Sequence, residues 1–151
     1  MSTFVLRNID LDNVLDIPYS EAAEFKPVEL YGDCHGGENQ LWRVRNGRIA
    51  SVIDTDLCLG VLNGVRDEEP IILVGHESDK ALTWKWGGGR CDFGNDDYLD
   101  ICDAIVCSEE ASLQIGPAKC GHGIALQKLS SSQQLWKKEE VEKMRDISYE
   151  I

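Results

Sequence analysis

Hydrophobic and polar residues alternate in short runs along the whole chain, and turn-forming residues separate the runs. This period of two is typical of β-strands with one buried face. We predict strands at residues 3–9, 14–17, 28–31, 42–45, 48–50, 51–53, 58–62, 70–74, 84–86, 98–101, 124–127 and 147–151. Many short strands at regular spacing indicate an all-β, barrel-like domain.

The clearest local signal is Asn46-Gly47, which separates the alternating runs 42–45 and 48–50. Both residue types tolerate the positive φ angles of a type I′ turn, so the pattern predicts a two-residue hairpin.

The last third of the chain is harder to interpret. Residues from Cys102 to about Cys120 read as an insertion, and the charged stretch 137–145 alone resembles the end of a helix. The run 147–151 alternates again and is predicted to pair with the N-terminal strand, which would leave no open edge.

Two short phrases recur along the chain. The first is Gln40-Leu41-Trp42, Leu82-Thr83-Trp84 and Gln134-Leu135-Trp136; the second is Leu15-Asp16-Ile17, Leu59-Gly60-Val61 and Leu99-Asp100-Ile101. Repetition at a fixed period indicates repeated structural units. We predict three imperfect repeats at about 1–50, 51–91 and 92–151 within one domain covering residues 1–151, with the three tryptophans in its core.

Composition narrows the classes of function. The formal charge of −12 disfavours a nucleic-acid binder or an anionic membrane surface as partner, because both need clustered Lys and Arg. No apolar run approaches the length needed to span a bilayer, and the first residues lack the layout of a signal peptide. We therefore expect a soluble protein without membrane insertion, either cytoplasmic or released by an unconventional route.

The six cysteines allow fifteen pairings, and reduced thiols are favoured for a chain with no signal peptide. If a disulfide exists, Cys107 and Cys120 are the pair we expect. The histidines are scattered and no Cys-x-x-Cys occurs, so we predict no metal, and no cofactor motif is present.

The recurring phrases, with Asn39-Gln40-Leu41-Trp42 followed by Asn46-Gly47, resemble the ricin B-type (R-type) lectin family. The resemblance covers essentially the whole chain and implies a β-trefoil fold. It also implies a sugar site in the first repeat. That carbohydrate-binding set is Asp16, Tyr31, His35, Asn39 and Gln40.

The same resemblance ranks the other two repeats. The second has Gly60 in place of the carboxylate and Val74 near the aromatic position, so we expect it to bind no sugar. The third retains a possible second carbohydrate site, whose aromatic position is occupied by Leu126. The residues of that site are Asp100, Gln133 and Gln134.

A carboxylate accepts hydrogen bonds from vicinal hydroxyls, a carboxamide donates and accepts, and an aromatic face covers the C–H patch of a sugar. The resemblance implies a lectin without catalytic residues that recognises galactose or N-acetylgalactosamine on glycoconjugates. The chemistry of one shallow site predicts about millimolar affinity for a free monosaccharide. Avidity would then need a second site or a homodimer.

Three readings compete with this one. The same fold could act as a protease inhibitor through the loop between Cys102 and Cys120. A glycosidase is the weakest hypothesis, because Asp16 and Asp100 belong to separate repeats. Finally, Gln40 could satisfy buried backbone groups, and Asp16 could stabilise a turn, with neither contacting a ligand. If the protein is a lectin and Asp16 contacts the sugar, we expect the Asp16 carboxylate to be exposed.

Overall fold

The computed structural model describes residues 2–87, 102–131 and 134–141. Predictions for the strands 98–101 and 147–151, and for Asp100 and Gln133, lie outside these residues. The described strands are β1 (Phe4–Asn8), β2 (Asn13–Asp16), β3 (Glu29–Tyr31), β4 (Trp42–Arg45), β5 (Arg48–Ser51), β6 (Leu57–Val61), β7 (Ile71–Gly75), β8 (Trp84–Trp86), β9 (Ile105–Cys107), β10 (Leu113–Pro117), β11 (Ile124–Lys128) and β12 (Trp136–Glu140). Of two short 3₁₀ turns, η1 (Pro18–Ser20) lies in the connection between β2 and β3, and η2 (Glu38–Gln40) lies between β3 and β4.

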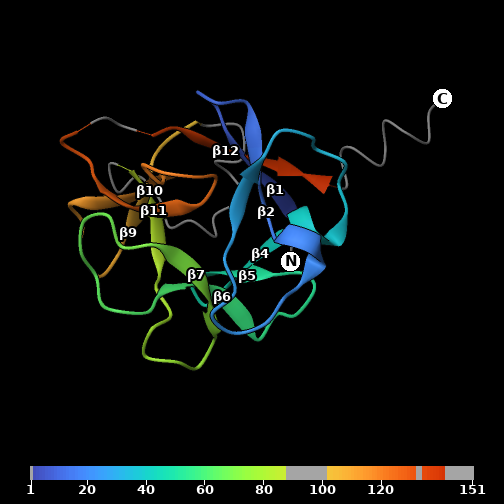
Figure 1. Ribbon diagram of the computed structural model, residues 1–151, viewed down its shortest axis with the longest axis horizontal. Helices are drawn as coiled ribbons and strands as arrows, with labels where there is room; N and C mark the ends of the chain where they lie inside the picture. The colour runs from blue at the N-terminus through green and yellow to red at the C-terminus, as the bar shows by residue number, and fades with distance from the viewer. Residues whose placement is uncertain (1, 88–101, 132–133, 142–151) are drawn as a thin grey trace.

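The strands form three sets of four: β1–β4, β5–β8 and β9–β12 (Figure 1). In each set the second and third strands form an antiparallel hairpin, with the apolar pairs Leu15–Leu30, Leu59–Leu73 and Ile115–Leu126 at corresponding positions. Successive sets are joined by the pairs β4–β5, β8–β9 and β12–β1. The last pair brings the two ends of the described chain together, and the arrangement is the predicted β-trefoil.

The predicted hairpin at Asn46-Gly47 is confirmed. Both residues have positive φ, 53° and 76°, and β4 pairs directly with β5 across them. The strand predicted at 51–53 is wrong, because Ser51 ends β5 and the next two residues form a bend.

The predicted insertion between Cys102 and Cys120 is also wrong. This segment contains β9 and β10, the first two strands of the third set. The sequence pattern does not reveal these strands, because the third set has Ile115-Gly116-Pro117 where the Leu-Asp-Ile phrase would stand.

The charged residues Lys137 to Glu140 belong to a strand, and residues 142–145 of the predicted helix end lie outside the described residues. β12 pairs with β1 from Phe4–Glu140 to Asn8–Trp136 and so fills the place predicted for residues 147–151. Its alternation places Lys138 inside, where the ammonium lies 5.4 Å from the ring centre of Phe4 and 5.9 Å from that of Trp86. The apolar stem of a lysine can be buried in this way while its charge faces aromatic rings.

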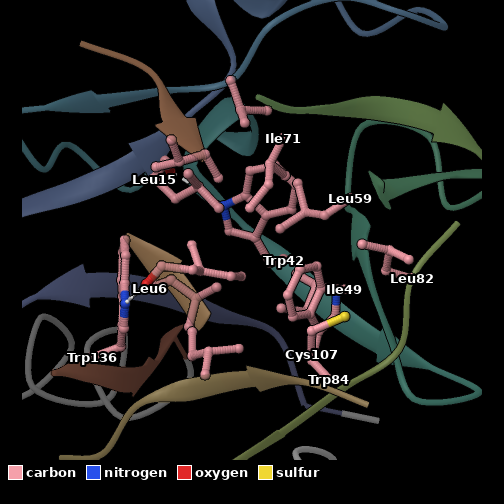
Figure 2. Packing of buried hydrophobic residues seen from close by; sticks show 14 of the residues in the cluster. Leu6, Leu15, Trp42, Ile49, Leu59, Ile71, Leu82, Trp84, Cys107 and Trp136 are labelled. Atoms are coloured by element: carbon pink, nitrogen blue, oxygen red, sulfur yellow. Dashed lines mark hydrogen bonds between the residues drawn. The ribbon is translucent and has the colours of Figure 1, made fainter. Parts of the chain in front are cut away.

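The three sets share one core. Trp42, Trp84 and Trp136 are fully buried in a single cluster with leucines and isoleucines from all three sets (Figure 2). The indole N–H of Trp42 donates to Leu15 O at 3.2 Å, and that of Trp136 donates to Ile115 O at 3.0 Å. The repeated tryptophans are therefore core residues, as predicted.

The described cysteines are free thiols, and the conditional pairing of Cys107 with Cys120 is not formed. Cys107 is buried in β9, whereas Cys120 is exposed beyond β10. Desolvation raises the pKa of Cys107 and raises that of Cys58 to about 11, so both thiols remain protonated at neutral pH.

Within the described residues, no group of three or more His, Cys, Asp or Glu side chains is placed to hold a metal ion. None of the helices in that part of the chain is long and apolar enough to cross a membrane.

Candidate functional site

A pocket of about 300 Å³ lies at the end of the β2–β3 hairpin, between η1 and the loop that follows β3. Four of the five side chains predicted for the first repeat line it. The complete lining is Asp16, Pro18, Tyr19, Glu29, Tyr31, His35 and Asn39. The fifth predicted residue, Gln40, lies behind the pocket.

Asp16 is the last residue of β2 and is 3% exposed, so the expectation of an exposed carboxylate is wrong. Its Oδ2 accepts hydrogen bonds from Asn39 Nδ2 at 3.2 Å and from Gln40 Nε2 at 2.9 Å. Desolvation raises the pKa of Asp16 above its ordinary value of 3.8, and the two amide donors offset part of that rise. Its second oxygen has no protein partner in the described residues, which leaves it free to accept a hydrogen bond from a ligand.

Gln40 is fully buried and organises the loop in front of it. Its Nε2 also donates to Asp33 O at 2.8 Å, while its Oε1 accepts from the backbone N–H of His35 at 3.0 Å and of Gly36 at 3.2 Å. All of these bonds satisfy groups of the protein itself. Gln40 therefore positions Asp16 and the loop, and the prediction that it lines the site is wrong.

His35 and Tyr31 form one wall of the pocket. The Nδ1 of His35 accepts the N–H of Gly37 at 2.9 Å, so in the neutral ring the proton is on Nε2 and can be donated. The two rings meet edge to face, with centroids 6.5 Å apart and planes at 67°. Tyr31 is 44% exposed, which leaves one of its faces open to a ligand.

Sequence reasoning missed Glu29, Pro18 and Tyr19. Glu29 lies directly opposite Asp16 in the β2–β3 register, two residues before Tyr31. Residues two apart in a strand share a face, so once Tyr31 was assigned to the site the period of two could have identified Glu29. It gives the pocket a second carboxylate.

Tyr19 could not have been found from the pattern. It is 92% exposed and has a φ of 56°, in the left-handed region, with Ser20 following at 56°. This conformation costs a non-glycine residue about 1–2 kcal/mol. Backbone strain at a residue with a large side chain on the rim of a pocket suggests that the side chain has a function.

In the second set, strand register places Gly60 at the position of Asp16 and Val74 at that of Tyr31. That this set binds no sugar stays a prediction. A smaller pocket of about 220 Å³ lies there, and its lining contains one carboxylate and no aromatic residue. The lining residues are Val61, Leu62, Gly64, Val65, Asp79, Lys80 and Leu82.

The prediction for the third set needs correction. Gly116 lies opposite Ala125 as Asp16 lies opposite Glu29, so Gly116, and not Asp100, occupies the position of the site carboxylate. Gln127, and not Leu126, corresponds to Tyr31, because Leu126 matches the buried Leu30. The described residues thus contain one complete set of the predicted side chains.

No family model matches the sequence, and no curated protein is significantly similar to it. Solved structures are similar in fold. The designed 3-fold symmetric protein ThreeFoil superposes with a TM-score of 0.67 at 15% identity, covering 91% of this chain and 97% of its own. The C-terminal half of the earthworm R-type lectin, in complex with GalNAc, gives 0.66 at 18% identity, covering 93% and 99%.

The ricin B-like lectin of Macrolepiota procera, in complex with lactose, gives a TM-score of 0.62 at 17% identity, covering 91% of this chain and 94% of that one. These likenesses establish the class of fold: the protein is a β-trefoil, and R-type and ricin B-like lectins are among its structural neighbours.

Proposed function

We propose that the protein is a non-catalytic, carbohydrate-binding lectin that recognises terminal galactose or N-acetylgalactosamine through the pocket of the first repeat. The observation that supports this proposal most strongly is that one pocket is lined by four residues of the predicted sugar site, namely Asp16, Tyr31, His35 and Asn39. The pocket combines a carboxylate oxygen without a partner, an amide, an imidazole N–H and an open aromatic face. Those are the groups that a sugar with one polar and one apolar face requires.

The choice of sugar rests on two kinds of support. Structural neighbours were solved in complex with GalNAc and with lactose, both of them galactose-type ligands. The pocket lining carries two carboxylates and no Lys or Arg, which disfavours anionic sugars such as sialic or uronic acids. A neutral galactose-type sugar fits both observations.

Calorimetric titration with galactose, N-acetylgalactosamine and glucose tests the proposal. We expect the first two to bind with a Kd of about 1 mM, the strength of a few solvent-competed hydrogen bonds and one stacked ring, and glucose to bind much more weakly. An equal response to all three sugars, or no response from folded protein, would refute the galactose assignment.

Glu29 gives the glycosidase hypothesis an observation it lacked, because two carboxylates now face one pocket. Glycoside hydrolysis needs such a pair as acid and base or nucleophile. Incubation with an aryl galactoside, followed by measurement of the released phenol, distinguishes the two functions. We expect no release above the uncatalysed rate.

The protease-inhibitor hypothesis loses the predicted insertion as its reactive loop. Much of the segment between Cys102 and Cys120 forms β9 and β10, paired strands of the third set, which a short exposed turn at 108–112 joins.

Galactose affinity is expected to fall in mildly acidic solution. The ionised form of Asp16 accepts the sugar hydroxyl, and burial raises its pKa, so binding should decline as the pH falls through that raised pKa, before an ordinary aspartate would protonate. Stability should move in the opposite direction, because a carboxyl whose pKa is higher in the folded state favours folding when protonated and loses that contribution as the pH rises. Titrations from neutral pH downward, paired with thermal melts, measure both trends.

His35→Asn is the matched control for this prediction, since an asparagine oxygen can still accept the Gly37 N–H while the imidazole is removed. The acidic loss of affinity should persist in this variant. Affinity that became independent of pH would assign the effect to His35.

A further inference from the structure

Tyr19 lines the same pocket as Asp16 and Tyr31. Tyr31 belongs to β3, Asp16 ends β2, and Tyr19 follows three residues after Asp16 in η1. The pocket lining thus combines two aromatic rings, from β3 and from η1, with the polar group of Asp16.

The ring of Tyr19 has no structural role in the described residues. It is 92% exposed, belongs to no core cluster and makes no recorded side-chain hydrogen bond. The backbone nevertheless holds it firmly in a left-handed conformation. Ser20 N–H donates to Ile17 O and Glu21 N–H donates to Pro18 O, both at 3.1 Å. Pro18, the residue before Tyr19, has its own φ fixed by its ring at the start of the turn.

We propose that Tyr19 is the platform for the second sugar residue of an extended glycan, and that it makes the protein prefer a galactose-terminated disaccharide over the free monosaccharide. The inference rests on the proposed function, because it places the terminal galactose between Asp16 and Tyr31. The next sugar then extends toward η1 and presents its C–H face to the Tyr19 ring. A strained, exposed aromatic at a pocket rim is explained if its packing partner is the ligand.

The test measures Kd for galactose and for lactose in the wild type and in Tyr19→Gly, Tyr19→Phe and Phe25→Gly. Glycine tolerates the positive φ, so Tyr19→Gly removes the ring while leaving the turn unstrained, and its melting temperature should not fall. Phe25 is the matched control: it is also an exposed aromatic, with a φ of 69°, in the same loop but outside the pocket lining.

We expect Tyr19→Gly to weaken lactose binding about three- to tenfold more than galactose binding, as loss of one stacked ring does. Tyr19→Phe and Phe25→Gly should retain the wild-type ratio of the two constants. If the wild type binds both sugars equally, or if Tyr19→Gly leaves the ratio unchanged, the platform is refuted while the galactose site stands. If the wild type binds neither sugar, the proposed function fails and this inference fails with it.

Discussion

Asp16→Asn is expected to reduce galactose affinity at least about tenfold without weakening the fold, because a hydrogen bond to a charged group contributes about 1.5–3 kcal/mol. The asparagine oxygen can accept the bonds from Asn39 Nδ2 and Gln40 Nε2 that Asp16 Oδ2 accepts now. The amide NH₂ then faces the pocket and donates where the sugar requires an acceptor. Calorimetric titration of the variant, alongside its thermal melt, measures both effects.

The melting temperature should stay the same or rise slightly, since burial disfavours the ionised carboxylate that this change removes. Asp16→Ala serves as the contrast: it removes the shared acceptor and should cost about 1–2 kcal/mol of stability as well as binding. Galactose affinity that survives Asp16→Asn would place the sugar elsewhere.

Gly60→Asp is expected to destabilise the protein by about 3 kcal/mol or more and to create no site in the second repeat. A Cβ at residue 60 would lie 2.3 Å from the backbone oxygen of Lys80 and 2.5 Å from a methyl group of Val74. The backbone atom cannot move aside without disturbing the bond from Val61 N–H to Lys80 O. Urea unfolding at neutral pH measures the loss.

Gly60→Ala isolates the steric part of this effect and should still cost most of the stability. Gly116→Ala is the matched control at the equivalent position of the third repeat, where the new Cβ would meet the end of the Gln127 side chain, which can rotate away. A Gly60→Ala variant as stable as Gly116→Ala would contradict the close backbone approach.

The sequence predicted the fold because its strongest signals are local. The Asn46-Gly47 turn, the alternation of the first strands and the recurring tryptophans each reflect chemistry within a few residues. The predictions failed where a different sequence fills an equivalent place. Ile115-Gly116-Pro117 occupies the place of Leu15-Asp16-Ile17 without resembling it, so the pattern predicts the third repeat too early and predicts an insertion where β9 and β10 lie.

The site was predicted in outline from the resemblance to R-type lectins. That resemblance implies Asp16, Tyr31, His35 and Asn39 as site residues, but the division between lining and supporting residues depends on depth, which sequence position does not encode. Gln40 is the clearest case: its side chain faces inward and holds the loop, although its sequence position matched a ligand contact.

Binding of a galactose-type sugar by one pocket, in the first repeat, can be located by NMR. In a titration of ¹⁵N-labelled protein with galactose, followed by two-dimensional spectra, we expect amide shifts at Gly36, Gly37 and Asn39. The corresponding loop around Lys80 and the strand at Gly116 should be unchanged. Shifts centred on Lys80 or Gly116, with the Gly36–Asn39 loop unaffected, would contradict binding at this pocket.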